Sequence, residues 1–248
     1  MGVVTGASSI LPDLLQSHQG LLGAEAALGE ALAREGLRIG ASVAHQWPLV
    51  HDHLQLYARG AGRAGLLVLA GAPDEGSRRT GIPFMGPLDA RERLGLDADG
   101  AARSPAAPAF WQAVGDAPLE ALFGAAILAH ANPFDAPDHA AVREAAARHV
   151  LRTLETTRPQ AVVTVGAAAL ATLGRALALR DLEDLARAPE ASWLARWPEG
   201  TRLTAYPRAE VRARPPFRAN VVPLPDLAGP LAGPASRALA CLMRVAIP

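Results

Sequence analysis

The residues of this chain that are best suited to chemistry lie in a polar loop that follows a short apolar run. Residues 66–70 are all apolar, as in a buried strand, and the small residues and proline at 71–73 end that strand. The loop behind them carries two acids and two bases, Asp74, Glu75, Arg78 and Arg79. Ligands of open α/β sheets usually bind in such loops at the carboxyl ends of strands. We therefore expect a ligand site here.

Phe84 closes this loop, and its ring has two interpretations. It lies between Pro83 and Gly86, so a stiff turn could hold the ring exposed at the end of the loop. An exposed aromatic face is a stacking platform for a planar ligand such as a nucleobase. The alternative is a core anchor tucked under the loop, which is the more usual place for phenylalanine.

A second loop with suitable side chains follows the next apolar run, at residues 125–129. It begins with His130 and Asn132 and continues into Pro133. An asparagine amide carries both an acceptor and two donors, so Asn132 could read the edge of a uracil base. Strand residues two apart share a face, so either side chain could reach the same pocket. The alternative is an Asn-Pro turn, with His130 at the end of the strand.

The first loop resembles a motif of the uracil-DNA glycosylase superfamily. Its end, Thr-Gly-Ile-Pro-Phe at residues 80–84, is similar to the family's G-x-P-F pattern and to the single-strand-selective monofunctional branch. The spacing from Ala72-Pro73 to Gly81 is similar to the iron–sulfur bacterial branch, and the run RPQAVVTVGAAAL at 158–170 resembles the superfamily's structural core. The resemblance spans roughly residue 47 to the C-terminus. It implies a base-excision repair enzyme that flips a base out of DNA.

The resemblance also implies roles for individual residues. Phe84 matches the aromatic residue that stacks on the flipped uracil. The family's water-activating polar residue falls at Gly71 or Ala72, neither of which can activate water. Counting back from the proline, the asparagine that pairs with the uracil edge falls at His130, and Asn132 is displaced from it by two residues.

The family's last motif is altered in this chain. Leu224-Pro225-Asp226 stands where the family has His-Pro-Ser, so the histidine that stabilises the departing uracil anion is absent. Leu227 remains as a candidate apolar wedge for the minor groove. Three carboxylates near the first motif are candidates to activate water in place of the missing group, Asp74, Glu75 and Asp89.

The implied reaction is monofunctional hydrolysis of the N-glycosidic bond of uracil or another deaminated base in DNA, slow or altered because two polar groups are missing. All 24 basic residues other than histidine are arginine, so no lysine is present to form an imine. One alternative is a catalytically weak or inactive glycosylase-fold module that binds DNA or a base. Another is a small-molecule hydrolase on a similar sheet, although the chain has neither a serine elbow nor a set of metal ligands.

Arginines supply the expected contacts to DNA. Residues 202–218 hold five arginines and one acid, Glu210, a surplus that could contact several phosphates. The arginines assigned to DNA are Arg78, Arg79, Arg212, Arg214 and Arg218. A solvated loop without a ligand is the alternative. Net charge is zero and the pI is 7.1, which argues against DNA binding that is driven mainly by long-range electrostatic attraction.

The apolar pattern predicts the elements that position these loops. Four buried strands, at 66–70, 125–129, 161–165 and 220–224, alternate with helices. The expected helices cover 21–36, 46–57, 87–94, a segment starting at 110, 137–157, 166–174, 181–197 and 234–245. This alternation is typical of an α/β fold, a three-layer α/β/α arrangement with a central four-stranded parallel sheet. We expect one domain over residues 1–248, with 1–20 loosely ordered.

The remaining features limit cofactors and location. A single cysteine, Cys241, excludes an internal disulfide and a cysteine-ligated metal cluster, and we expect it to be a small core residue. His51 and His53 are expected to be surface or partly packed side chains rather than a metal pair. The sequence therefore predicts no cofactor and no metal. With no apolar run of ~20 residues and no signal peptide, we expect a cytoplasmic monomer whose partner is DNA and not a membrane.

Overall fold

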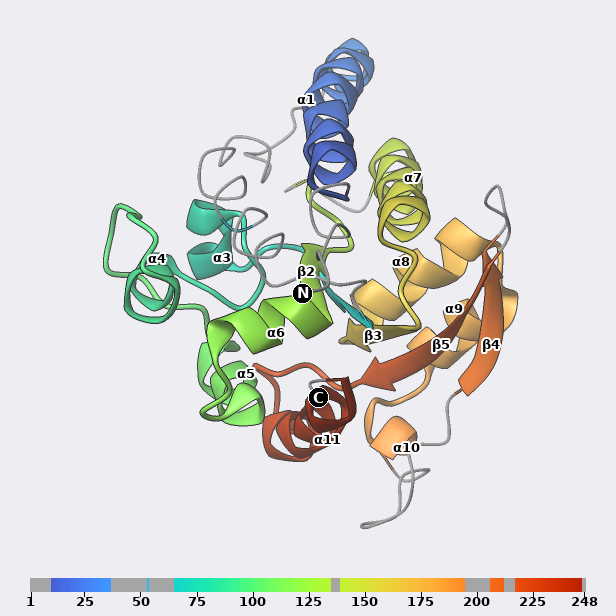
Figure 1. Cartoon of the computed structure of the whole chain (residues 1–248). Helices are drawn as coiled ribbons and strands as arrows, with labels where there is room; N and C mark the ends of the chain where they lie inside the picture. Colours follow the sequence, from blue (N-terminus) through green and yellow to red (C-terminus); the bar gives the residue numbers. More distant parts are fainter. Residues whose placement is uncertain are drawn as a thin grey trace, which may run out of the picture.

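The computed structural model describes residues 10–36, 53, 65–134, 139–194, 206–211 and 217–246 (Figure 1). Its centre is a five-stranded sheet in the order β2-β1-β3-β5-β4. The strands are β1 (Leu66–Ala70), β2 (Ala126–His130), β3 (Ala161–Val165), β4 (Tyr206–Val211) and β5 (Phe217–Leu224). Strands β2, β1, β3 and β5 are parallel to one another, so the predicted four-stranded parallel sheet is confirmed.

The fifth strand, β4, was not predicted. It pairs with β5 in the antiparallel direction and forms one edge of the sheet. Its sequence, YPRAEV, contains a proline and two charged residues and has no apolar run. Prolines and charges are typical of edge strands, which need no continuous apolar face, so the pattern that reveals buried strands does not reveal this one.

The register of the parallel strands brings their carboxyl ends to one edge of the sheet. Leu66 in β1 pairs with Ala126 in β2 and with Ala161 in β3. The strands next to one another therefore begin and end at the same level, and Ala70 at the end of β1 lies opposite His130 at the end of β2. The first and second loops thus start as neighbours.

Helices cover both faces of the sheet, which gives the three layers that the sequence predicts (Figure 1). One layer consists of α7 (Ala140–Thr157), α8 (Ala167–Leu177) and α9 (Arg180–Arg187), with α1 (Ile10–Arg34) packed against α7. The other layer consists of α5 (Ala107–Val114), α6 (Leu119–Ala125) and α11 (Ala232–Ala246). Short helical segments complete the described chain, namely α3 (Glu75–Thr80), α4 (Pro87–Asp89), the π-helix η2 (Ala90–Leu94) and α10 (Ala191–Leu194).

Three sequence-based expectations about these elements are corrected. Helix α1 begins at Ile10, so about half of the stretch expected to be loose is helical. The polar loop after β1 contains α3, because Asp74 caps its first turn and Gly81, with φ 75°, ends it. Cys241 is exposed on α11 rather than buried.

The described residues contain neither a candidate membrane-spanning helix nor a candidate metal-binding cluster. None of their helices is both long enough and apolar enough to cross a membrane. Their histidine, cysteine, aspartate and glutamate side chains nowhere gather in a group of three or more that could hold a metal ion.

Candidate functional site

The turn that carries the first motif is held by the hydroxyl group of Thr80. This side chain is fully buried, and its Oγ1 donates a 2.6 Å hydrogen bond to the carbonyl of Met85. The same oxygen accepts the N–H of Ile82 at 3.1 Å. Two backbone groups of the tight turn are therefore satisfied by one side chain, which makes the turn stiff even though it is not part of a helix or strand.

Phe84 is held by this turn but faces the interior. Its backbone has φ 63°, a conformation that costs a bulky residue about 1–2 kcal/mol. Its ring is 4% exposed and stacks on Phe110, with 5.0 Å between ring centroids and 17° between ring planes. The expectation of an exposed stacking platform is corrected in this structure, because the packed aromatic pair stabilises the buried position. The alternative, a core anchor, describes Phe84.

A short segment of backbone, Ala102–Ser104, lies directly against the first loop, and we refer to it as the strap. A Cβ atom at Gly86 would lie 2.3 Å from the carbonyl oxygen of Ala102. One at Gly76 would lie 2.5 Å from the carbonyl oxygen of Arg103. Both glycines are required by this close approach, and the loop and strap form one packed unit.

Asp89, one of the three candidate water activators, anchors the strap. Its carboxyl group is buried, and Oδ2 accepts the N–H groups of Gly86 at 2.9 Å and Ser104 at 3.0 Å. Its Oδ1 accepts a 2.7 Å hydrogen bond from Arg103. Both oxygens are bound to donors of the loop and strap, so the structural role of Asp89 is to link these two segments.

Asp74 is also held in place, whereas Glu75 is exposed. Oδ1 of Asp74 accepts the N–H of Ser77 at 2.8 Å as the cap of α3, and Oδ2 accepts the hydroxyl of Ser104 at 2.6 Å. Glu75 lies on the exposed side of the first turn of α3. Of the three candidates, Glu75 is the carboxylate that water reaches freely.

Changing Asp89 to asparagine is expected to lower the free energy of unfolding by about 1–3 kcal/mol, because an amide oxygen that accepts the two backbone N–H groups turns its NH2 group toward the Arg103 guanidinium, and the charge that faces Arg103 is lost. Urea unfolding of Asp89→Asn beside Asp116→Asn, a change at an exposed acid, measures the effect. Equal stability of the two variants would contradict the structural role of Asp89.

His130 lies at the junction of the first two loops and is electrically neutral at pH 7. Its Nδ1 is 3.4 Å from the carbonyl oxygen of Gly71. Burial lowers its pKa to about 4, although the Gly71 carbonyl and the negative charge of Asp74 both act in the opposite direction. Its Nε2 is buried and has no hydrogen-bond partner among the described residues.

A cavity of about 480 Å³ opens at the carboxyl edge of the sheet, and we refer to it as the carboxyl-edge cavity. Gly71 and Ala72 after β1 and Asn132 after β2 lie on its wall, together with parts of α7, α8 and α9. β1 and β3 are the neighbours at which the chain changes direction across the sheet, and ligands of such sheets bind at that point. The structure thus brings together three predicted site residues.

The other predicted residues lie elsewhere. Phe84, His130 and the three carboxylates do not line the carboxyl-edge cavity. The side-chain oxygen of Asn132 accepts the N–H of Phe134 at 3.1 Å, which leaves its amide N–H groups to face a ligand.

The last motif is held by a residue that the sequence did not single out, Glu190. Its carboxylate accepts the N–H of Ala167 at 3.1 Å and the N–H of Asp226 at 3.0 Å. The loop after β5 is therefore tied to the start of α8. Leu227 in this loop is only 1% exposed and belongs to the core, so its expected role as a wedge is corrected, since a wedge must project from the surface. No local sequence motif marks Glu190.

The predicted DNA-binding arginines are only partly described. Arg79 and Arg218 are exposed, and Arg78 is half-buried. Arg212 and Arg214 lie outside the described residues, as does His51, and the helix expected at 46–57 lies outside them except for residue 53. The described His53 is buried against Phe123, which corrects the expectation of a surface or partly packed side chain.

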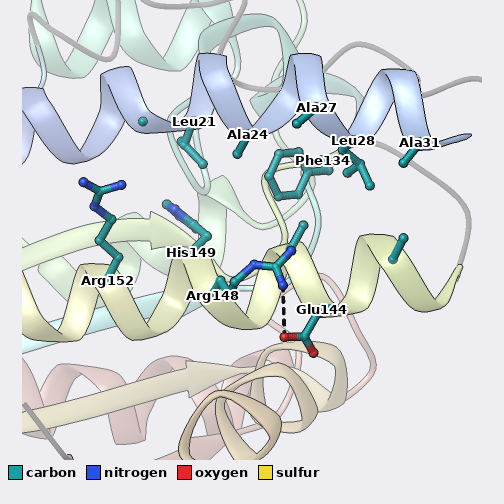
Figure 2. Close-up of a pocket in the computed structure, with 13 residues that line it drawn as sticks. Leu21, Ala24, Ala27, Leu28, Ala31, Phe134, Glu144, Arg148, His149 and Arg152 are labelled. Atoms are coloured by element: carbon teal, nitrogen blue, oxygen red, sulfur yellow. Dashed lines mark hydrogen bonds and ion pairs between the residues drawn. The ribbon is translucent and has the colours of Figure 1, made fainter.

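A second cavity, of about 530 Å³, lies between α1 and α7 (Figure 2). Its α1 wall is apolar and includes Leu21 and Leu28, and Phe134 lies between the helices. On α7, Arg148 and Glu144 form an ion pair of 3.2 Å. No residue that the sequence predicts for the site lines this cavity.

No protein-family model matches the chain, and a comparison with curated proteins found no match either.

Proposed function

We propose that this chain recognises uracil or another deaminated base in DNA and releases it slowly by monofunctional hydrolysis of the N-glycosidic bond. The carboxyl-edge cavity carries this proposal. It has the size of a small-molecule site, and its wall includes Gly71, Ala72 and Asn132, from the two loops in which the resemblance puts the base. The amide N–H groups of Asn132 can donate to a carbonyl oxygen at the edge of uracil or hypoxanthine. The three-layer fold is also the one that the resemblance implies.

The contacts around the first loop account for slow release. Asp74 and Asp89 are held by donors of α3, the loop and the strap, so neither carboxylate is free to turn toward a water molecule at a base. Leu224 stands where the family has a histidine. None of the three carboxylates lines the carboxyl-edge cavity, and we assign water activation to Glu75 because it is the exposed one. A general base that takes a proton from the attacking water typically raises the rate of such a reaction 10²–10⁴-fold.

Glu75→Gln is accordingly expected to lower the rate of base release by at least about 10²-fold while leaving DNA binding unchanged, because the amide cannot accept a proton from water. Single-turnover release of uracil from an oligonucleotide measures the rate. Glu155→Gln on the exposed side of α7 is the matched control. Unchanged release by Glu75→Gln would remove this residue from the mechanism.

The proposal as a whole is tested by single-turnover assays on oligonucleotides that contain uracil or hypoxanthine, each as single strand and as duplex. We expect slow release from at least one of them. No release from any of them over hours at excess protein would exclude the hydrolase.

The second candidate is a glycosylase-like module that binds DNA or a base without cleaving it. The hydrogen bonds of Asp74 and Asp89 favour it, as does the packing of Phe84 against Phe110. A mobility-shift titration beside the activity assay separates the two candidates. The module predicts salt-dependent binding of the oligonucleotides without release.

A further inference from the structure

The carboxyl-edge cavity carries positive charge that none of the predicted roles uses. Three arginines line it, one from each of three helices, Arg143 on α7, Arg175 on α8 and Arg187 on α9. Glu183 is the acid on its wall, so the charged side chains of the lining sum to a formal charge of +2. A cavity lined in this way attracts an anion.

Small side chains make room for such a ligand. Five alanines contribute to the wall in addition to Ala72, namely Ala146, Ala167, Ala168, Ala171 and Ala186. Ala168 approaches the end of β1 closely, since a Cβ atom at Gly71 would lie 3.6 Å from its methyl group. The alanine wall thus continues to the position where the first loop leaves the sheet.

Two of the arginines are held only weakly by their present partners. The Nη2 atom of Arg175 lies 4.0 Å from Oε2 of Glu183, at the outer limit for an ion pair. Arg187 pairs with Asp184 one turn away, and both side chains are more than two thirds exposed. An exposed pair such as Arg187–Asp184 contributes little to stability, and the half-buried Arg175–Glu183 pair is at the outer limit of contact, so either guanidinium can exchange its partner for a ligand at little cost.

We propose that the carboxyl-edge cavity is a phosphate subsite for a nucleotide, in which Arg175 and Arg187 bind the phosphate oxygens and the alanine wall receives the attached sugar and base. Guanidinium groups bind phosphate through paired, charge-assisted hydrogen bonds, and two of them match the charge of a phosphate group. A volume of about 480 Å³ is ample for a nucleoside monophosphate and far larger than a small inorganic anion needs.

The nucleotide is either free or part of a DNA strand, and this part of the inference rests on the proposed function. The recognition of phosphate by the two arginines does not depend on base release. The experiment therefore uses four ligands: dUMP, deoxyuridine, a uracil-containing single strand and the same strand with thymine.

Calorimetric titration of the full chain tests the subsite. We expect dUMP to bind at least about tenfold more tightly than deoxyuridine, which lacks the phosphate, because each charge-assisted hydrogen bond to the phosphate contributes about tenfold or more to affinity. The double variant Arg175→Gln/Arg187→Gln is expected to lose that tenfold difference. The matched control is Arg237→Gln, which removes one exposed arginine on α11 in the other helical layer and leaves binding unchanged.

A steric variant keeps the test decisive if the charge changes disturb folding. Ala171→Phe keeps every arginine and fills the cavity, so it too is expected to weaken dUMP binding at least tenfold. Equal binding of dUMP and deoxyuridine to the wild-type chain, or equal dUMP affinity of the double variant and Arg237→Gln, would overturn the subsite.

The four ligands also separate this inference from the proposed function. Tighter binding of the uracil strand than of dUMP, reduced by the double variant, supports a DNA phosphate as the occupant. Tight binding of dUMP alone supports a free nucleotide. Arginine-dependent binding of uracil and thymine strands alike, with no base release, supports the subsite and counts against the glycosylase.

Discussion

Replacing Phe84 with alanine is expected to lower the free energy of unfolding by about 3–5 kcal/mol, as for other phenylalanines buried in cores. The ring is 4% exposed and stacks on Phe110 at 5.0 Å, so its removal leaves a cavity beside a second aromatic ring. Urea unfolding measures the change. A loss below about 1 kcal/mol combined with weaker binding of uracil-containing DNA would instead establish the ring as a ligand platform.

Replacing Phe84 with glycine distinguishes the contribution of the ring to stability from the cost of the backbone strain. Alanine keeps the strain of a φ of 63°, whereas glycine adopts this conformation without a steric penalty. Phe84→Gly should therefore be no less stable than Phe84→Ala, although glycine usually destabilises a chain. The double change Phe84→Ala/Phe110→Ala should cost less than the sum of the single changes, by about 0.5–1.5 kcal/mol for the aromatic pair.

The sheet could be predicted from the sequence because burial on both faces requires continuous apolar runs. The strands at 66–70 and 161–165 have the predicted bounds, and β2 is displaced by one residue from its prediction. The antiparallel β4 could not be found in this way, since an edge strand needs no such run. The parallel order then fixes which loops meet at one edge, and this places residues 71, 72 and 132 on one cavity.

The functions of single side chains in the first loop could not be predicted in the same way. A carboxylate in a polar loop has the same sequence signature whether it activates water or binds backbone N–H groups. Asp89 accepts the N–H of the nearby Gly86, but its second backbone donor is present because Ser104, fifteen residues later, folds back over it. The partners of Asp74 and Glu190 also come from distant parts of the chain, at Ser104 and Asp226. Such contacts depend on tertiary packing, which local spacing does not encode.

Acidification from pH 7 to pH 4 is expected to lower the free energy of unfolding by about 3 kcal/mol for each of two buried histidines, His53 and His130. Burial lowers the pKa of each from 6.5 to about 4. Within the part of the chain that the structure describes, neither ring nitrogen of His53 has a hydrogen-bond partner of ordinary geometry, and the Leu128 backbone opposes the shift less than burial favours it. Below pH 6.5 the unfolded chain binds protons that the folded chain does not, and stability therefore falls until the folded histidines are protonated near pH 4.

The variant His130→Asn isolates one of these two contributions from the carboxylates that also titrate in acid. Asparagine does not bind a proton in this range, so the difference in stability between the variant and the wild type should shift by about 3 kcal/mol in favour of the variant between pH 7 and pH 4. His139→Asn is the matched control, because the His139 side chain is 25% exposed and pairs with Glu35, whereas His130 is buried. Parallel curves for wild type and His130→Asn would mean that His130 is solvated in the folded chain. The neutral, buried imidazole next to Gly71 and Asp74 would then have to be abandoned, and with it the packed junction of the first two loops.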